Sequence, residues 1–316
     1  MDKPTSSTAW WQDLALERGG LRARKTGALV PLSPRNLVAM GRGFANYTAT
    51  QGLRLGSSFS PARTFRIAFL PHKPQPWYLI WSVLHAAGGR IVSDPALADA
   101  VFYFEDSTAC NEDPLAEVLP LPDSLRRINC HCLDVSKSKV ARVFEDVFGY
   151  ALSLDPTQWQ GEAVEKSEVN GAHDGRIITC PSERRDGKVY EHVIANSDNG
   201  QFIEDLRTPM VGGEMALVYI KQRAMAYRFA NTNDRVLLRR PEQIFSLEER
   251  AKLKAFCQAM QLDWGGLDVL RDRNSGKIYV VDVNKTDMGP PTALPLIEQV
   301  RSVKVLSRLF RCYMDQ

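Results

Sequence analysis

The chain has 316 residues, of which 44% are hydrophobic and 24% charged, and its formal net charge is +3. This length is enough for two or three domains or subdomains with a sizeable core. The charge is too small for a nucleic-acid-binding surface, which usually has clustered Lys and Arg. No apolar run approaches the roughly 18 residues that a membrane span needs, and the N-terminal residues lack the order typical of a signal peptide. We therefore expect neither nucleic acid nor a membrane as a partner.

Six cysteines in a chain of this length do not suggest a disulfide scaffold. Cys130 and Cys132 flank His131, but no second ligand pair at zinc-like spacing accompanies them. We predict a strand with two semi-buried thiols there rather than a metal site. Reduced cysteines are most simply explained by a cytoplasmic location.

Residues 1–60 give the weakest signals and are predicted to be a helical or irregular N-terminal extension. The segment from Trp10 to Leu16 suggests a short amphipathic helix. Ser57–Pro61 is typical of a linker into the first clear strand.

Residues 61–133 contain the pattern of a small α/β unit. Phe65–Leu70 predicts a strand, Trp77–Ala87 a helix that stops at two glycines, and Ala100–Phe104 a second strand. This order favours a parallel sheet. The loop after the first strand contains His72 and Lys73, which either contact an anionic substrate or form a simple loop.

Residues 134–195 combine a helix with short strands. Apolar side chains from Val140 to Phe148 lie on one helical face, and Gly149 ends the helix. Strands are expected over Ala163–Lys166, Arg176–Ile178 and Lys188–Ile194.

Residues 196–316 begin with a predicted hairpin at Gly212 and Gly213, followed by a strand over Met215–Ile220. Ser246 and Glu249 form a capping-box pattern that starts a helix. The apolar segment Ile297–Tyr313 is expected to be a terminal helix packed on the core or on a second copy, which leaves a homodimer open.

Two strands near the C-terminus are the most informative feature. Gly266–Asp272 and Lys277–Asn284 are apolar β-type segments separated by a turn, and they bring Asp268, Asp282 and Asn284 to neighbouring positions. Asp and Asn are disfavoured inside strands, and hard oxygen ligands are what Mg²⁺ takes together with substrate phosphates. We predict a metal site; the alternative is a surface hairpin with incidental acids. Asp272 belongs to the turn.

Cationic motifs precede these strands in the chain. Lys166 lies on a strand before the glycine-containing loop Asn170–Gly175, and Glu204–Arg207 forms an acidic strand that ends in arginine. A strand lysine supplies a point charge to phosphate, and glycines allow backbone N–H groups to approach anionic oxygens. Taken alone, the loop also fits a β-turn, and Asp205 and Arg207 also fit a simple ion pair.

With the metal strands, these motifs resemble the ATP-grasp superfamily, which includes carboxylate–amine ligases. The resemblance implies an α/β fold of α+β lobes: a pre-ATP-grasp α/β domain over 61–133 and an ATP-grasp domain over 134–316, with lobes of about 134–195 and 196–316. It is strong for the C-terminal half, and the first half matches by topology.

The resemblance also implies roles for individual residues. Asp268, Asp282 and Asn284 would bind two Mg²⁺, with Mn²⁺ as an alternative, and the nucleotide would contact one of Lys137 and Lys139 near the start of a helix. The implied strand lysine and closing loop are Lys166, His173 and Gly175. The implied hinge, whose backbone recognises adenine, is Tyr190, Glu191, His192 and Val193. The implied cations for the γ-phosphate and the substrate are Arg207, Lys221 and Arg228. His173 is alternatively a substrate contact, and His192 an ordinary strand residue.

The implied activity is that of an ATP- and Mg²⁺-dependent ligase. ATP would phosphorylate a substrate carboxylate, an amine would attack the acyl phosphate, and ADP and phosphate would leave. The carboxylate and amine substrates, small molecules or peptides, are not specified by the sequence. A small-molecule kinase of the same fold and a non-catalytic nucleotide-binding protein are the alternatives.

Overall fold

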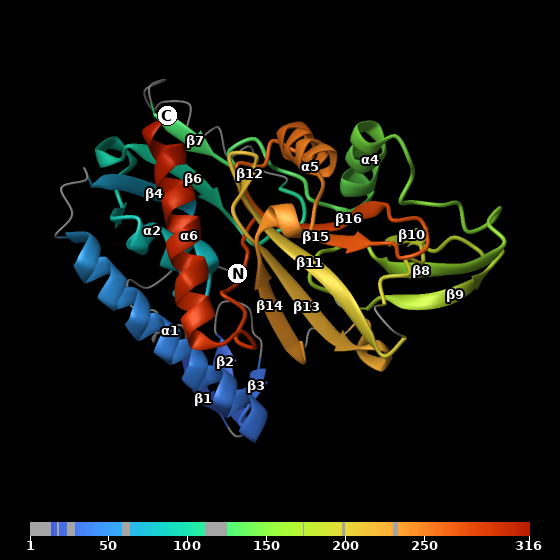
Figure 1. Cartoon of the computed structure of the whole chain (residues 1–316), viewed down its shortest axis with the longest axis horizontal. Coiled ribbons are helices and arrows are strands. Elements are labelled where there is room, and N and C mark those ends of the chain that lie inside the picture. The colour runs from blue at the N-terminus through green and yellow to red at the C-terminus, as the bar shows by residue number, and fades with distance from the viewer. Residues whose placement is uncertain are drawn as a thin grey trace.

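Four β-sheets and the helices packed on them make up the described part of the chain (Figure 1). The computed structural model describes residues 14–17, 19–23, 29–58, 64–110, 125–172, 174–197, 200–229 and 233–316. The sheets and helices confirm the predicted α/β class. Within these residues, no helix is both long and apolar enough to cross a membrane.

The N-terminal part differs from the sequence-based expectation. Leu16 lies on a strand of a small antiparallel sheet, so the predicted amphipathic helix is wrong at this residue, whereas Trp10 and Trp11 lie outside the described residues. A long helix follows the sheet; the predicted helical or irregular extension did not locate it. These elements are β1 (Leu14–Glu17), β2 (Gly20–Ala23), β3 (Leu29–Pro31) and α1 (Pro34–Ser58).

The next unit is a parallel four-stranded sheet in the order β5-β4-β6-β7, which confirms the predicted α/β unit. Its elements are β4 (Phe65–Pro71), α2 (Leu79–Ala86), β5 (Gly89–Val92), η2 (Pro95–Leu97), β6 (Ala100–Phe104) and β7 (Arg126–Ile128). Cys130 and Cys132 are buried, but they lie in a turn after β7, so the strand predicted there is wrong. The turn is anchored by Asn129, whose side-chain amide donates to the Trp264 carbonyl at 2.7 Å.

A helix and a small antiparallel sheet form the following lobe. The helix α4 (Lys137–Phe148) begins after Ser136, whose hydroxyl accepts from the Lys139 N–H, and ends at Gly149 with φ of 81°. The sheet has the order β10-β8-β9 and consists of β8 (Gly161–Ser167), β9 (Arg176–Cys180) and β10 (Lys188–His192).

The largest sheet is antiparallel in the order β14-β13-β11-β15-β16, with β12 paired to β11. Gly212 and Gly213, with φ of 57° and 78°, form the predicted hairpin between β11 and β12. The elements of this region are β11 (Phe202–Val211), β12 (Glu214–Met215), β13 (Val218–Ala224), η3 (Met225–Tyr227), β14 (Arg235–Arg239), η4 (Pro241–Gln243), α5 (Leu247–Ala259), β15 (Trp264–Arg271) and β16 (Ile278–Asn284).

Strand alternation gives this large sheet two different faces. Leu206, Ile220, Leu267 and Val283 belong to one hydrophobic cluster with residues of α4 and α5, which cover that face (Figure 1). The side chains one position along each strand therefore point to the opposite face.

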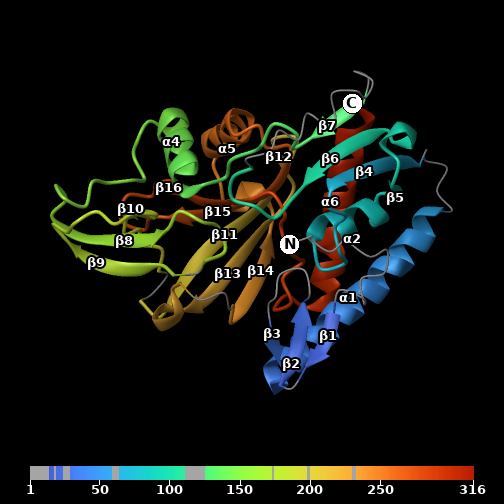
Figure 2. The same ribbon diagram turned by 180° about the vertical axis from the view of Figure 1, so that it is seen from behind.

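The terminal helix α6 (Leu296–Asp315) packs against α2 and α1 on the side of the parallel sheet (Figure 2). Its buried residues include Val303, Leu306 and Phe310. Of the two sequence-based alternatives, packing on the core is thus observed.

Candidate functional site

The register of the large sheet brings three charged residues of different strands side by side. Arg207 on β11 is the partner of Asp268 on β15, and Asp268 is the partner of Asp282 on β16. Directly paired residues of antiparallel strands share a face, so these side chains lie on the face opposite α4 and α5. The register shifts by a bulge immediately after Asp268.

Asp268 is held as an anion by cations on two sides. Its Oδ2 accepts from Arg207 Nη1 at 2.7 Å, and its Oδ1 lies 3.8 Å from Lys221 Nζ. Burial raises the pKa of Asp268, but the charges of Arg207 and Lys221 outweigh this effect and hold the pKa at about 2. Oδ1 is buried and has no hydrogen-bond partner. This oxygen is therefore available as a metal ligand.

Arg207 is fixed by a second carboxylate that the sequence did not single out. Asp287 Oδ1 accepts from Arg207 Nη2 at 2.6 Å and from its Nε at 3.2 Å, and Asp287 is 3% exposed. Burial lowers the pKa of Arg207, but Asp268 and Asp287 together raise it above its ordinary value. Arg207 thus remains charged in a buried site.

The first lysine of α4 reaches the same site. Lys137 is 8% exposed, and its Nζ donates to Asp282 Oδ1 at 2.5 Å and to Asn170 Oδ1. Asn284 Nδ2 donates to Asp282 Oδ2 at 3.2 Å. Lys139 is half-exposed, and its backbone N–H donates to Ser136 Oγ at the start of the helix. Of the two lysines that the sequence could not separate, Lys137 is the one placed at Asp282.

The small sheet adds a second lysine from the opposite side. Lys166 Nζ lies 2.7 Å from Glu191 Oε2 and donates to the Val281 carbonyl of β16 at 3.0 Å. Burial raises the pKa of Glu191, whereas the Lys166 charge opposes this shift. β8, β10 and β16 therefore meet at this ion pair, next to Asp282.

Asn170 connects the loop after β8 to the site. Besides accepting from Lys137, it donates through Nδ2 to the Val283 carbonyl at 3.0 Å, and its N–H donates to Thr108 Oγ1 at 2.8 Å. The loop is thus docked between β16 and the segment after β6. His173, in the same loop, lies outside the described residues.

Two of the four predicted hinge residues point away from the lysines. Tyr190 Oη donates to Glu165 Oε2 at 3.1 Å and accepts from the Arg185 N–H, while the His192 ring packs on Trp159. In the register of β8 and β10, Tyr190 and His192 share the face of Glu165, whereas Glu191 shares the face of Val164. Val193 directly follows β10.

Arg228 and Gly175 lie further out, where β9 meets η3. Arg228 Nη2 donates to the Ile194 carbonyl directly after the predicted hinge, and a Cβ on Gly175 would lie 2.5 Å from Phe229. Both residues line an open groove together with Tyr227 and Arg176. Their contacts are thus with η3, β9 and the Ile194 carbonyl rather than with the Asp268 and Asp282 carboxylates.

Asp205 is paired with Arg223 on β13, and not with Arg207. The alternative of a simple Asp205–Arg207 pair is thus wrong, because Arg207 turns to β15 and Asp287 instead.

The donor set fits Mg²⁺ bound together with phosphates. No group of three or more His, Cys, Asp or Glu side chains that could hold a metal occurs among the described residues. Asp268 and Asp282 instead supply two carboxylates, and Asn284 adds an amide oxygen. Mg²⁺ commonly takes only one or two carboxylates and completes its shell with water and substrate phosphates. This set, in which Asp268 Oδ1 has no hydrogen-bond partner, is suitable for it.

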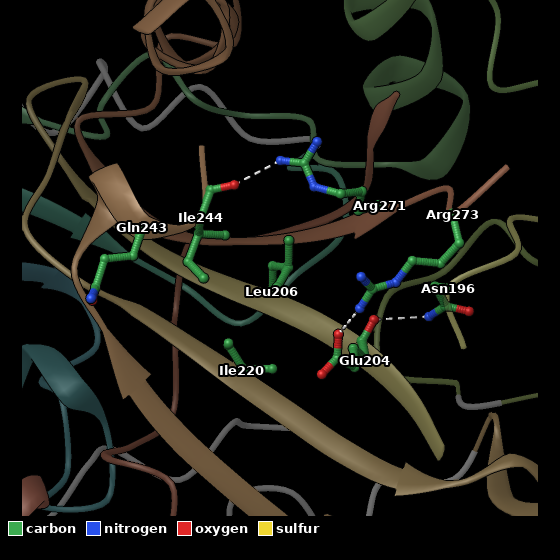
Figure 3. A pocket seen from close by; sticks show the side chains of 8 residues that line it. All are labelled: Asn196, Glu204, Leu206, Ile220, Gln243, Ile244, Arg271 and Arg273. Atoms are coloured by element: carbon green, nitrogen blue, oxygen red, sulfur yellow. Dashed lines mark hydrogen bonds and ion pairs between the residues drawn. The ribbon is translucent and has the colours of Figure 1, made fainter. Parts of the chain in front are cut away.

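A separate pocket lies on the α5 side of the large sheet (Figure 3). Leu206 and Ile220, which form its floor, directly precede Arg207 and Lys221, so it lies on the other face of the sheet. Its charged residues are bound to neighbours: Arg271 donates to the Ile244 carbonyl at 2.8 Å and Arg273 pairs with Glu204. This pocket is distinct from the candidate site.

Comparisons with known proteins give structural likeness at low identity. No protein-family model matches the sequence, and no curated protein matches it. The structure is similar to that of the ATP-grasp ligase PsnB complexed with minimal precursor, with a TM-score of 0.47 and 12% identity over 78% of this chain and 100% of that chain. It is also similar to a RimK domain ATP-grasp protein from Sphaerobacter thermophilus DSM 20745, with a TM-score of 0.45 and 14% identity over 79% and 100% of the chains. For the macrocyclase MdnC bound with precursor peptide MdnA from Microcystis aeruginosa MRC, the TM-score is 0.43 and the identity is 11% over 78% of this chain and 99% of that chain.

Proposed function

We propose that this protein is an ATP-grasp ligase, which uses Mg²⁺ and ATP to activate a substrate carboxylate for attack by an amine. The observation that supports this function best is the meeting of Asp268, Asp282 and Asn284 on two neighbouring strands with Lys137 and Lys166 from facing elements. The ligands lie on one face of the large sheet, and the lysines that a nucleotide triphosphate needs reach them from α4 and from β8 of the small sheet.

Each residue has a part that follows from its position. Asp268, Asp282 and Asn284 would hold the Mg²⁺, and a bound Mg²⁺ would supply charge neutralisation for the phosphate oxygens. Lys137 and Lys166 give up their carboxylate partners and bind phosphate oxygens. Arg207, buried and fixed by Asp287, directs a planar set of N–H donors at the developing negative charge.

Four further residues of the sequence-based prediction have supporting roles in this proposal. Backbone groups of Glu191 and Val193 would contact adenine at the connection that leaves β10, and Arg228 stabilises this connection through the Ile194 carbonyl. Burial lowers the pKa of Lys221, and the charge of Asp268 opposes this shift. Lys221 would supply positive charge next to Arg207. No side-chain nucleophile is needed, because positioning and electrostatic stabilisation are sufficient for this chemistry.

The first experiment measures Mg²⁺-dependent ATP binding by isothermal titration calorimetry for the wild type and for Asp282→Asn. This substitution keeps the side-chain shape but removes the charge, so we expect ATP binding in Mg²⁺ to weaken about tenfold or more. Asp146→Ala, an exposed aspartate on α4, is the control and should bind as the wild type does. Wild-type protein without Mg²⁺-dependent ATP binding, or unchanged binding by Asp282→Asn, would contradict the proposal.

The reaction type is tested by its products. A screen of carboxylates and amines should release ADP and phosphate when both partners are supplied. A stable phosphorylated product formed from one substrate alone would instead identify a kinase.

A further inference from the structure

The loop after β8 is attached to the first turn of α4 at two places. Glu168 Oε1 accepts from the Ser138 N–H at 3.0 Å, and its Oε2 accepts from the Ser138 hydroxyl at 2.9 Å. A carboxylate at the N-terminus of a helix is favourable, because the free N–H groups and the helix dipole face it. Asn170 makes the second attachment, to the side chain of Lys137. The loop is therefore bound to the helix turn whose lysine reaches Asp282.

Asn170 uses both ends of its side-chain amide. Its Oδ1 accepts from Lys137 Nζ, and its Nδ2 donates to the Val283 carbonyl of β16 at 3.0 Å. An ammonium group only donates and a carbonyl only accepts, so the two partners fix the orientation of the amide. An aspartate could accept from the lysine but could not donate to the carbonyl, and an apolar side chain could do neither. These contacts therefore favour an amide at this position.

A contact from the segment after β6 holds the backbone of Asn170. Its N–H donates to Thr108 Oγ1 at 2.8 Å, and the Thr108 carbonyl accepts from the Val135 N–H at 2.8 Å. Val135 lies two residues before Lys137 in the chain. The contacts thus form a closed ring from Thr108 through Asn170 and Lys137 back to the chain before α4. Moving any member of this ring breaks a hydrogen bond, so the ring restricts the position of the Lys137 side chain.

The two partners of the Lys137 ammonium group differ in charge. Asp282 Oδ1, which accepts from it at 2.5 Å, belongs to a carboxylate that is also a proposed metal ligand. The Asn170 oxygen is neutral, so it can hold the ammonium group without cancelling its charge. A lysine side chain loses much rotamer freedom when it is ordered, and ordering it before a ligand binds lowers the cost of binding.

We propose that Asn170 is a positioning residue, which holds the Lys137 ammonium group where it binds a phosphate of the nucleotide, and that Thr108 in turn holds Asn170. This role rests on the proposed function, because it takes Lys137 as a phosphate ligand. It goes beyond that function by making the nucleotide affinity depend on Thr108, which has no proposed contact with the nucleotide.

The first test is a double-mutant cycle on ATP affinity, measured by calorimetry in saturating Mg²⁺. Asn170→Ala removes both amide contacts, so the affinity should fall about threefold to tenfold. In a Lys137→Met background no ammonium group remains to be positioned, and the same substitution should change the affinity by less than about twofold. An equal loss in both backgrounds would mean that Asn170 acts independently of Lys137, and this result would overturn the proposal.

The second test replaces Asn170 by aspartate and needs no second substitution. The new carboxylate would pair with Lys137 and cancel the charge that binds phosphate, and it would face the Val283 carbonyl without a donor. ATP affinity should therefore fall further in Asn170→Asp than in Asn170→Ala. A residue that acted only by its size in the loop would give the opposite order, because aspartate is closer in shape to asparagine. That order would contradict a role through the lysine charge.

Thr108→Val tests the other end of the ring. Valine has a similar shape but lacks the oxygen that accepts from the Asn170 N–H, so ATP affinity should fall about twofold to fivefold. Unchanged affinity would overturn the role of Thr108. Asn274→Ala is the matched control for all these variants, because Asn274 is an exposed asparagine in the turn between β15 and β16. It should bind ATP as the wild type does.

The two proposals fail in different ways. Wild-type protein that does not bind Mg²⁺–ATP contradicts the ligase function, and the positioning role with it. Wild-type binding that depends on Lys137 but is unchanged in Asn170→Ala contradicts only the positioning role, and the ligase function remains.

Discussion

The position of the Arg207 side chain is fixed by the residues around it. Its guanidinium lies between Asp268 and Asp287, and both carboxylates accept from it. The side chain also passes over Gly266 of β15, where an added Cβ would lie 2.4 Å from Asp287 Oδ2 and 2.6 Å from Arg207 Nε. Position 266 therefore has to be glycine for the pair to form.

Gly266→Ala should disturb the Arg207–Asp287 pair without touching a proposed ligand. Because both contacts are shorter than real Cβ contacts, the pair has to shift, and we expect a loss of about 1–3 kcal/mol in the free energy of unfolding. Urea unfolding measures this loss. Gly41→Ala, on α1, where the new Cβ would have no atom within 4 Å besides the neighbouring residues and backbone of its own helix, should instead be neutral or stabilise by up to about 1 kcal/mol. A Gly266→Ala protein as stable as the wild type would contradict the steric argument.

The sequence identified the site residues that lie on elements with strong patterns. Asp268 and Asp282 interrupt apolar strands, which a single sequence displays directly. Asp287 follows β16 in a polar run that looks like an ordinary loop, and its role depends on an ion pair to a residue 80 positions away. The choice of Lys137 over Lys139 likewise depends on helix orientation, which sequence spacing does not provide.

At the scale of elements, periodicity decided which predictions succeeded. The strand pair β15–β16, the glycine hairpin and the α4 and α5 helices follow from local patterns and caps, and the structure confirms them. The helix α1 was missed because it contains Gly41, Gly43 and Gly52, and glycine disfavours helix interiors. β5 was missed because four residues give little periodic signal.

Glu249 links the N-terminal cap of α5 to the large sheet. It closes the capping box of α5 with Ser246, and its two carboxylate oxygens accept from Arg271 of β15 at 2.7 and 2.9 Å. Burial raises the pKa of Glu249, but the hydrogen bonds and charge of Arg271 lower it overall, below its ordinary value of 4.5. A carboxylate with a lowered folded-state pKa stabilises the protein above the unfolded-state pKa, and this stabilisation is lost as the pH falls through the folded-state value.

Glu249→Gln should therefore cost about 1–3 kcal/mol of unfolding free energy at pH 7, since the charge-assisted bonds to Arg271 are lost. The difference from the wild type should shrink as the pH falls below 4.5. Urea titrations from pH 7 to pH 3 measure both effects. Glu248→Gln, in the same helical turn with an exposed side chain, should change stability by less than about 0.5 kcal/mol. A pH-independent difference for Glu249→Gln would contradict this explanation.

At the scale of the molecule, the order of the motifs along the chain predicted an α/β unit followed by lobes that enclose a site. The domain limits at 60/61 and 133/134 stay predictions. How the parts join was not predictable, because the join depends on contacts distant in sequence: the Leu79 N–H donates to the Asp287 carbonyl, and Tyr78 pairs with Met288. The residue that fixes Arg207 thus also contacts the start of α2.

Lys137, Lys166 and Arg207 are each paired with a carboxylate. If the proposed function holds, nucleotide binding is an exchange of counter-ions, in which the triphosphate and its Mg²⁺ would replace pairs that the protein makes with itself. Added salt weakens the internal pairs and the new ones alike, so the two effects partly cancel. We expect the ATP affinity, measured by calorimetry in saturating Mg²⁺, to fall less than about threefold between 50 and 500 mM NaCl. A much steeper fall of the affinity would mean that these cations are not paired with carboxylates before the nucleotide binds. If the exchange holds, these three cations present no unpaired positive charge before a nucleotide binds, and other polyanions gain little by binding beside them.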